Sequence, residues 1–342
     1  HGLFGRSDRQ GDERRYSRVG SLTMGVPFYD AETVAGLLDY PGCIAAMRNA
    51  MAALSTCDRD QPLRQIVSLR EGAMFGVMPG DLSSSGCFGA KLISVFHDPE
   101  DPRRSRHRGV VAAFDAATGE LKCLADAEPV TAIRTACATA AATDALARAD
   151  AQVLAVFGTG MQAETHLRAV RLVRPFAELI AWGRSPEAFA SRMSAELGVP
   201  VTPVADARKA AERADVICTV SGSHEPILRG EWVQPGTHVN LVGSSALGAV
   251  EIDTALVTMA RYIADYRPGV LTQGSEFAAA RSAGAVTDDH VVGEIGEVFA
   301  GRLTGRQNAA QVTLYKTLGH IVQDLAAAAY IHARATNGTT TQ

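Results

Sequence analysis

The stretch from Ala151 to Ala163 constrains the fold more than any other, because a run of buried-type residues passes directly into a Gly-x-Gly turn. Residues 153–157 predict a strand, and a helix-forming sequence follows the turn. Gly158 permits a tight turn, Gly160 lacks a Cβ that would keep a phosphate away, and Ala163 lets helix and strand pack closely. Glycines often only end strands, so the motif alone is weak. The strand before it and the helix after it are the context that a dinucleotide-binding turn requires.

The turn is therefore predicted to bind the pyrophosphate of a dinucleotide at a helix N-terminus. The residues assigned to this role are Gly158, Thr159, Gly160, Met161 and Gln162.

The type of cofactor is indicated after the next predicted strand, residues 179–182, where Gly183, Arg184 and Ser185 follow. Sites that prefer NAD usually place Asp or Glu here, to bind the ribose 2′-hydroxyl. Guanidinium and hydroxyl groups instead attract a 2′-phosphate. We therefore favour NADP(H), with NAD(H) as the alternative. A surface arginine at a helix start is the other interpretation of Arg184.

Two later groups follow strands of the same series. They are Thr219, Val220 and Ser221 after residues 216–220, and Val242, Gly243 and Ser244 after residues 238–242. Open α/β sheets bind ligands at the carboxyl ends of their strands, so both groups are candidate cofactor contacts. Both also fit ordinary loops.

The order of predicted elements divides the chain into two kinds of structure. Strands at 64–69, 74–78, 90–96, 109–115 and 121–125 have few helices between them, which indicates an α+β region outside any doubly wound sheet. An alanine-rich helix at 132–148 leads into a strand–helix series with strands at 153–157, 179–182, 201–204, 216–220, 238–242 and 262–265. That series predicts an α/β fold, with a Rossmann-type doubly wound parallel sheet. Residues 311–319 lead into an apolar helix at 321–334.

Composition excludes several classes of function. The net charge of −4 gives no general attraction to nucleic acid or to an anionic membrane, and no apolar run approaches the roughly 20 residues that span a bilayer. The six cysteines are scattered, which predicts buried thiols in a reducing cytoplasm and no metal site. The polar first 23 residues predict a disordered leader.

Several spaced motifs together resemble the ornithine cyclodeaminase/mu-crystallin family, over nearly all of the chain after residue 23. These motifs are Pro62-Leu63-Arg64, Val77-Met78-Pro79, Ala90-Lys91-Leu92-Ile93-Ser94, residues 131–136, 158–163, 214–217, 225–228, 230–240 and 293–298, Lys316-Thr317-Leu318-Gly319 and Gln323-Asp324. The resemblance implies a homodimer, built through the N-terminal domain and the returning C-terminal helix. It also implies a nicotinamide dinucleotide on the Rossmann domain, and an amino-acid or imino-acid substrate in the cleft between domains.

With this resemblance, residues 24–131 and 311–342 are assigned to an α+β substrate-binding and dimerisation domain, and residues 132–310 to the Rossmann domain. Thr317 and Leu318 match family positions that approach the nicotinamide. Lys316 and Asp324 fit either the same motif or a structural ion pair at the domain junction.

Arg64, Lys91 and Arg134 match family positions that bind the substrate α-carboxylate. Most lone Lys and Arg side chains are merely solvated, but the apolar residues after Lys91 indicate a buried strand, where an unpaired ammonium is costly. Two guanidiniums suit a carboxylate through charge-assisted hydrogen bonds. We assign all three cations to substrate binding, and we add the hypothesis that Lys91 is catalytic and gives a proton to the substrate nitrogen.

Ser245 distinguishes the reactions that the family carries out. Its cyclodeaminases have Asp at the matching position, whereas the ketimine-reductase-like members do not. A hydroxyl is a poor general base near neutral pH. The sequence therefore favours an NAD(P)H-dependent reductase of a small α-imino acid, such as a cyclic ketimine, or an amino-acid dehydrogenase-like reaction. A redox-neutral ornithine cyclodeaminase using NAD+ and a non-catalytic NADPH-dependent binding protein are the alternatives.

Overall fold

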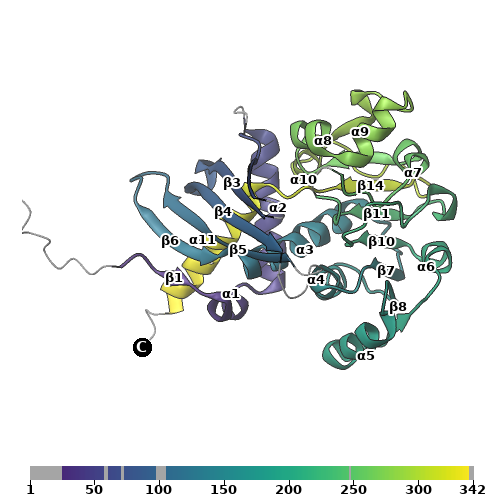
Figure 1. Cartoon of the computed structure of the whole chain (residues 1–342), viewed down its shortest axis with the longest axis horizontal. Helices are drawn as coiled ribbons and strands as arrows, with labels where there is room; N and C mark the ends of the chain where they lie inside the picture. The colour runs from purple at the N-terminus through teal and green to yellow at the C-terminus, as the bar shows by residue number, and fades with distance from the viewer. Residues whose placement is uncertain (1–24, 58–60, 71–72, 98–104, 246–247, 339–342) are drawn as a thin grey trace, which may run out of the picture.

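The computed structural model describes residues 25–57, 61–70, 73–97, 105–245 and 248–338 (Figure 1). The predicted leader, residues 1–23, lies outside them. Two sheets stand side by side. Helix α3 lies at the junction between them, and helix α11 packs against α3 and the first sheet.

Within the described residues, the first sheet has six strands in the order β1-β6-β5-β4-β3-β2. Its strands are β1 (Phe28–Tyr29), β2 (Gln65–Arg70), β3 (Ala73–Leu82), β4 (Cys87–His97), β5 (Ser105–Asp115) and β6 (Leu121–Asp126). All neighbours are antiparallel except β1 and β6. The five strands predicted for this half are confirmed, and the antiparallel pairing confirms that they form a separate sheet.

Alternation along these strands gives the sheet two different faces. Met78 pairs with Lys91 and Lys91 with Val111, so the three side chains share one face. The returning helix α11 (Ile321–Gly338) covers this face, and its Asp324 contacts Lys91. The predicted C-terminal helix is thus confirmed, and it brings the end of the chain back to the first sheet.

Helix α3 (Ala127–Leu146) packs against elements of both halves. It begins five residues before the predicted helix, because the Asp126 carboxylate caps it by accepting from the N–H of Glu128, and Pro129 fits its first turn. Its alanines and threonines are buried on nearly all sides, since small side chains let other helices and strands approach closely. The remaining helices of the first half are α1 (Ala31–Leu37) and α2 (Tyr40–Thr56), with the short 3₁₀ turn η1 (Ser83–Ser85).

The second sheet is wholly parallel and, in the described part of the chain, has eight strands in the order β13-β12-β14-β11-β10-β7-β8-β9. These are β7 (Val153–Phe157), β8 (Glu178–Trp182), β9 (Val201–Pro203), β10 (Val216–Thr219), β11 (His238–Leu241), β12 (Arg261–Ala264), β13 (Val291–Glu294) and β14 (Thr313–Lys316). The six predicted strands are confirmed to within one or two residues at each end.

Connecting segments surround this sheet. They are α4 (Met161–Val170), α5 (Pro186–Leu197), α6 (Ala207–Arg213), α7 (Thr254–Met259), α8 (Arg267–Gln273), α9 (Ser275–Ser282) and α10 (Ile295–Phe299), with η2 (Gly230–Trp232) and η3 (Asp288–His290). The chain runs outward from β7 through β8 to β9, and then returns to start β10 on the other side of β7. The carboxyl ends of β7 and β10 therefore form the switch point where doubly wound sheets bind ligands.

Strand β14 departs from the sequence prediction. Residues from 311 on were assigned to the first domain, but β14 lies between β11 and β12 in the parallel sheet. Its four residues, Thr-Leu-Tyr-Lys, are all buried, but so short a mixed sequence resembles a helix lead-in as much as a strand. The chain thus completes the second sheet with β14 and enters the first half only with α11.

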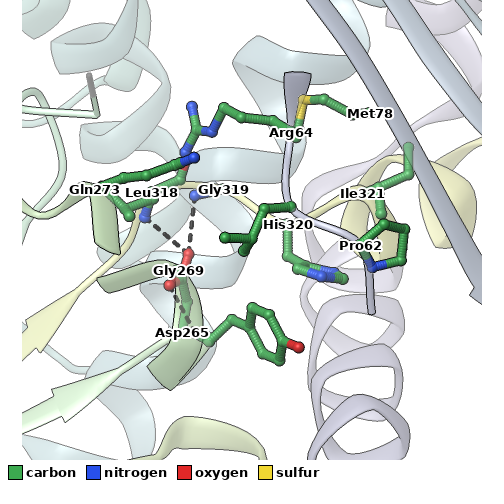
Figure 2. A pocket seen from close by; sticks show the side chains of 12 residues that line it. Pro62, Arg64, Met78, Asp265, Gly269, Gln273, Leu318, Gly319, His320 and Ile321 are labelled. Carbon is green, nitrogen blue, oxygen red and sulfur yellow. Dashed lines mark hydrogen bonds between the residues drawn. The ribbon is translucent and has the colours of Figure 1, made fainter. Parts of the chain in front are cut away.

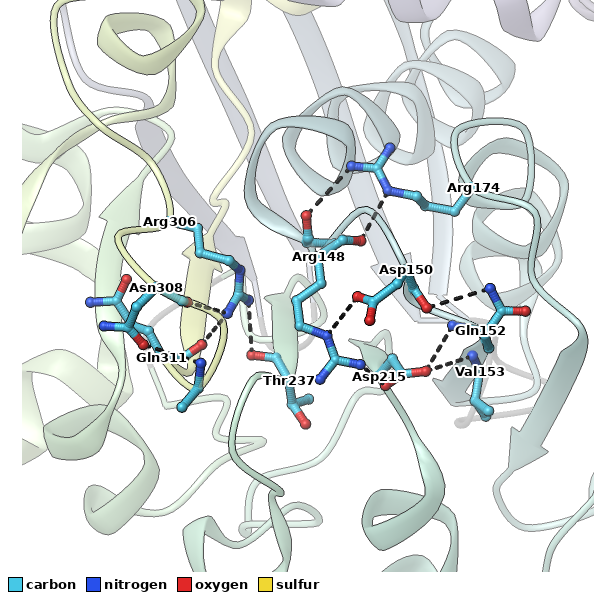
Figure 3. A network of polar contacts seen from close by, with 12 residues as sticks. Arg148, Asp150, Gln152, Val153, Arg174, Asp215, Thr237, Arg306, Asn308 and Gln311 are labelled. Atoms are coloured by element: carbon cyan, nitrogen blue, oxygen red, sulfur yellow. Dashed lines mark hydrogen bonds and ion pairs between the residues drawn. The ribbon is translucent and has the colours of Figure 1, made fainter.

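Arginines tie the amino ends of the parallel strands together, far from the switch point (Figure 3). Arg148 donates to the carboxylate of Asp215 at 2.7 Å, directly before β10. Arg306 donates to the Leu146 carbonyl at 2.8 Å and to the Thr313 hydroxyl at 2.9 Å. These bonds join the C-terminal end of α3 to β10 and β14, so α3 is held firmly against the sheet.

Candidate active site

A cavity of about 460 Å³ opens at the carboxyl ends of β7, β10 and β11, and both halves of the chain line it. From the first half it is lined by Lys91, Ile93, Arg108, Ala127, Glu128, Thr131, Ala132, Arg134 and Thr135. From the second half come Gly160, Met161, Gln162, Val220, Ser221, Gly222, Val242, Gly243, Ser245, Thr317, Leu318 and Gly319. Its size is within the range of sites for small molecules and cofactors.

The glycine turn has the geometry that the sequence predicts. Gly158 has a φ of +151°, and a Cβ there would lie 2.8 Å from the carbonyl oxygen of Val220. A Cβ on Gly160 would meet only open space, and this glycine is the N-cap of α4, so the helix begins at Met161 without a side-chain cap. The first N–H groups of α4 therefore face the cavity uncapped, which suits a phosphate group.

Gln162 is a second residue here that fits a polar ligand. Its buried Oε1 has no hydrogen-bond partner among the described residues, and the residue lines the cavity. Buried polar atoms are nearly always paired, so an unpaired one beside an open cradle fits a bound polar group. The chain's own residues at this end of the cavity thus fit a dinucleotide.

A buried carboxylate, Glu251, arranges the two loops after β10 and β11. It accepts hydrogen bonds from the Thr219 hydroxyl at 2.9 Å, from the Ser221 N–H at 2.6 Å and hydroxyl at 2.8 Å, and from the Ser244 N–H at 3.1 Å. Burial raises the pKa of Glu251, although these donors act in the opposite direction. Thr219 and Ser244 were both predicted to contact the cofactor, but the Thr219 hydroxyl bonds to Glu251, and the Ser244 hydroxyl accepts from Lys316.

Lys316 completes that arrangement, and the structure contradicts its pairing with Asp324. Its ammonium donates to the Ser244 carbonyl at 2.7 Å and hydroxyl at 2.6 Å, and forms an ion pair with Glu276 at 3.3 Å. Asp324 pairs with Lys91 and Arg134 instead. Lys316 lies on β14 in the second sheet, whereas Asp324 lies on α11, so the two belong to separate clusters.

A second buried carboxylate, Asp265, holds the loop between β14 and α11. It accepts from the Thr317 hydroxyl at 3.0 Å. It also accepts from the N–H groups of Leu318 at 2.7 Å and Gly319 at 2.8 Å (Figure 2). Burial raises the pKa of Asp265, and the same bonds oppose that effect. Thr317 and Leu318 are thereby fixed at the cavity wall, where they were predicted to lie.

Lys91 and Arg134 share one carboxylate at the wall of the cavity. Lys91 Nζ lies 3.0 and 3.1 Å from the two oxygens of Asp324, and Arg134 Nε lies 3.0 Å from one of them. Lys91 and Arg134 are 3% exposed and Asp324 is fully buried. Two cations and one anion leave one net positive charge in a nearly dry site, which favours an anionic ligand.

The Lys91 ammonium has a pKa not far above neutral pH. Burial lowers the pKa of Lys91 to about 8, the Asp324 carboxylate opposes this, and the charges of Arg134 and Arg64 add to the lowering. Burial alone would raise the pKa of Asp324, but Arg134 and Lys91 outweigh it and keep that pKa below its usual value. Lys91 is thus mainly protonated at neutral pH and loses its proton just above it.

The third cation, Arg64, has another orientation than predicted. Its Nη1 donates to the Ser245 carbonyl at 3.1 Å and its Nη2 to the Leu318 carbonyl at 2.7 Å. It lines a separate pocket of about 20 Å³ with Met78 and His320 (Figure 2), which has room for about one water molecule. Arg64 therefore supports two loops of the cavity from behind and does not line the cavity itself.

The residues after β8 lie apart from the cavity. A Cβ on Gly183 would be 2.8 Å from Thr159 Cγ2, so strand end and glycine turn pack tightly together. Arg184 and Ser185 are exposed, and Ser185 precedes α5 without capping it. A guanidinium and a hydroxyl thus remain beside the glycine turn, in the place where the sequence analysis expects the ribose of the cofactor.

Of the predicted cofactor contacts, one set lines the cavity and another does not. The first set is Gly160, Met161, Gln162, Val220, Ser221, Val242, Gly243, Thr317 and Leu318. Gly158 and Thr159 form the turn behind it, and Gly183, Arg184 and Ser185 extend beyond it. Ser245, which distinguishes the family's reactions, also lines the cavity.

Gln323 and Asp324 were named only as part of a family motif, and their role in positioning Arg134 was not predicted. Glu251 and Asp265 were not singled out. Asp324 and Gln323 hold Arg134, since Gln323 Oε1 accepts from Arg134 Nη1 at 2.6 Å. A signal for them was present, because Gln-Asp interrupts an otherwise apolar helix and a charge in such a run needs a partner. Glu251 and Asp265 carry a similar but weaker signal, because each is a single carboxylate beside apolar residues, with an apolar neighbour on each side of Glu251 and the strand β12 directly before Asp265.

Three further predictions from the sequence concern metal ligands, membrane-spanning helices and cysteines. No group of three or more His, Cys, Asp or Glu side chains there is arranged to hold a metal ion. No helix of the described chain is long and apolar enough to cross a membrane. The cysteines are free thiols, and the prediction that all are buried is wrong for Cys57, which is exposed because it follows the last turn of α2.

Comparison with known proteins places the chain among relatives of similar architecture. Residues 28–339 match the model of the ornithine cyclodeaminase/mu-crystallin family. The ketimine reductase mu-crystallin of Mus musculus is 32% identical over 276 residues, which cover 80% of this chain and 84% of that protein.

Two solved structures extend the likeness to the whole fold. Thermococcus litoralis Δ1-pyrroline-2-carboxylate reductase, in complex with NADH and L-proline, aligns with a TM-score of 0.87 at 27% identity, covering 92% of this chain and 98% of that one. An archaeal alanine dehydrogenase dimer with bound NAD aligns with a TM-score of 0.83 at 26% identity, covering 92% and 97%.

Proposed function

Because the chain belongs to the ornithine cyclodeaminase/mu-crystallin family, we propose that it is an NAD(P)H-dependent oxidoreductase that reduces the C=N bond of a small α-imino acid. The observation that carries the proposal is the shared cavity. Lys91 and Arg134 line it together with the glycine turn, Thr317 and Leu318. A carboxylate-binding pair thus shares one cavity with a dinucleotide cradle, and the cavity has the size that a cofactor and a small substrate need.

The cradle would hold the nicotinamide dinucleotide, which supplies the hydride when bound. Gly160 and the uncapped first turn of α4 would bind its pyrophosphate, and Thr317 and Leu318 would lie against its nicotinamide end. Glu251 and Asp265 keep these loops in place through hydrogen bonds that are already formed. Such preorganisation limits the cost of ordering the site on binding.

Arg134 and Lys91 would bind the α-carboxylate of the substrate. Asp324 and Gln323 occupy Nε and Nη1 of Arg134, while its Nη2 has no hydrogen-bond partner among the described residues. The remaining positive charge of the cluster attracts a carboxylate, and positioning it fixes the C=N carbon relative to the hydride donor. Arg64 would act by supporting the loops at Ser245 and Leu318.

Lys91 would also supply the proton of the reaction. Reduction of an imine adds a hydride to carbon and a proton to nitrogen. The Lys91 ammonium, whose pKa of about 8 lies close to neutral pH, can give that proton and regain it from solvent. The Thr131 hydroxyl, 3.3 Å from Lys91 Nζ, lies on the same wall and adds a second polar contact.

The preferred cofactor in this proposal is NADP(H). Support comes from Arg184 and Ser185, which are exposed at the end of β8 where an acidic residue would select NAD. Arg184→Asp is expected to weaken NADPH binding and improve NADH binding, because a carboxylate repels the 2′-phosphate and accepts from the 2′-hydroxyl. Dissociation constants from nicotinamide fluorescence measure the ratio, with Arg208→Asp on the surface helix α6 as control. An unchanged ratio would refute the preference.

We also propose that the protein is a homodimer in the cytoplasm. Leu92 pairs with Val77 on the sheet face opposite Lys91, and this face leaves Leu92 36%, Phe88 37% and Val67 50% exposed. Contiguous exposed apolar side chains usually mark an interface. Light scattering is expected to give twice the 36.1 kDa mass of one chain, and Leu92→Arg is expected to return it to the single mass. The free thiols fit a reducing compartment.

The function is tested by following NADPH oxidation with purified protein. The panel is Δ1-pyrroline-2-carboxylate, Δ1-piperideine-2-carboxylate, and α-keto acids with ammonia or methylamine. Turnover of a cyclic imine supports a ketimine reductase, and turnover only with keto acid and amine supports an amino-acid dehydrogenase-like reaction. Proline and ammonia from ornithine with catalytic NAD+ would instead establish a cyclodeaminase, against the expectation from Ser245. Cofactor binding without turnover on the whole panel would identify a binding protein.

A further inference from the structure

Asp324 is the only described carboxylate that bonds to both buried cations of the cavity, Lys91 and Arg134, yet it does not line the cavity itself. It lies on α11, which joins the first sheet after the chain has left the second. Through it, one helix reaches Lys91 on β4 and Arg134 on α3. The next residue toward the N-terminus, Gln323, holds the other edge of the same guanidinium at 2.6 Å.

We propose that Asp324 is the positioning residue of this site: it aligns Lys91 and Arg134 toward the cavity and keeps Lys91 charged during turnover. The effect on turnover rests on the proposed function, whereas the alignment of Lys91 and Arg134 by Asp324 does not. Two oxygens of Asp324 fix Lys91 Nζ at 3.0 and 3.1 Å, so the ammonium has little freedom to turn away. The same carboxylate leaves Arg134 Nη2 as the free end of the guanidinium.

The charges around Lys91 explain why a carboxylate is needed there. Arg134 from α3 and Arg64 from the segment before β2 both face Lys91 and disfavour its charge. From α3 the Thr131 hydroxyl is neutral, and His320 beside α11 is kept neutral because burial lowers its pKa to about 4. Arg108 of β5 and Glu128 of α3 lie at the same cavity, and both are exposed to solvent, which screens them. Asp324 is therefore the main group that favours the protonated form of Lys91.

The first variant is Asp324→Asn, which keeps the shape of the side chain and removes its charge. If Lys91 is the proton donor, kcat/KM falls at high pH as Lys91 loses its proton. This falling part of the pH profile is called its alkaline limb. Without the Asp324 charge the pKa of Lys91 drops, so this limb is expected to move to lower pH by about one to three units. The same limb at the same pH in variant and wild type would overturn the proposal.

The second variant, Gln323→Glu, adds a negative charge near Lys91, where Asp324→Asn removes one, and it leaves the Lys91–Asp324 pair intact. It adds a carboxylate beside Arg134 Nη1, so the pKa of Lys91 is expected to rise and the limb to move to higher pH. Movement of both variants in one direction would mean that the limb reports a structural change and would also overturn the proposal. This variant provides the test if Asp324→Asn does not fold.

A measurement without turnover separates this inference from the proposed function. Acetic anhydride acetylates only neutral amines, and mass spectrometry locates the acetyl group on Lys91 at each pH. The pH at which Lys91 is half as reactive as its neutral form is the midpoint of this titration. The midpoint is expected to fall in Asp324→Asn and to rise in Gln323→Glu, with Lys122 on β6 as the internal reference. Shifted midpoints in a protein that reduces no imine would reject the function and keep Asp324 as the positioning residue. Unshifted midpoints would reject the role of Asp324 whatever the protein reduces.

Discussion

Replacing Lys91 with methionine is expected to lower kcat for imine reduction about 10²- to 10⁴-fold, because the site then lacks its proton donor. Methionine keeps the length and apolar stem of the side chain and removes the ammonium. Arg134 remains paired with Asp324, so the carboxylate is not left as an isolated buried charge. The affinity for NADPH should be unchanged, because Lys91 bonds to Asp324 and Thr131, whereas the cofactor pyrophosphate is expected at the glycine turn.

Steady-state kinetics and fluorescence titration of NADPH measure the two halves of this prediction separately. Lys122→Met is the matched control, since Lys122 pairs with Asp115 near the surface of the same sheet. Wild-type turnover in Lys91→Met would remove Lys91 from the mechanism. A parallel loss of NADPH binding would mean that the substitution disturbs the whole cavity.

Replacing Gly319 with alanine is expected to raise the KM for the imino acid about tenfold or more. Gly319 has a φ of +78°, and a Cβ there would lie 2.9 Å from Nη1 and 3.0 Å from Nη2 of Arg134. The guanidinium must then move, and it loses hydrogen bonds to Asp324 and Gln323 that are worth about 1.5–3 kcal/mol each as charge-assisted bonds. A displaced Arg134 no longer presents its free end to the substrate carboxylate.

Gly301→Ala separates this effect from backbone strain. Gly301 has a φ of +71°, and its Cβ would meet nothing within 4 Å. Backbone strain should cost both variants about 1–2 kcal/mol of unfolding free energy, because an L-residue disfavours the left-handed region, and Gly319→Ala should lose more through the displaced guanidinium. Only Gly319→Ala should change the KM. Equal KM values in the two variants would show that the contact with Arg134 has no bearing on substrate binding.

Much of the fold could be predicted because its signals are local. The apolar run before Gly158 and the glycine spacing define a strand–turn–helix unit within a few residues. Alternating and continuous apolar patterns separate the antiparallel half from the parallel half in the same way. The missed strand β14 is short and fully buried, so its pattern does not distinguish strand from helix, and only its neighbours β11 and β12 define it.

The sequence by itself predicted a dinucleotide-binding turn from residue type and local spacing, and its resemblance to the family pointed to Lys91 and Arg134 as the residues for an anionic substrate. Only the tertiary structure decided how the cations are held. Asp324 reaches Arg134 across 190 positions of the chain, and Arg64 reaches the Leu318 carbonyl across 254. No local pattern specifies such partners, because a buried charge requires an opposite charge nearby but not at any particular distance along the chain.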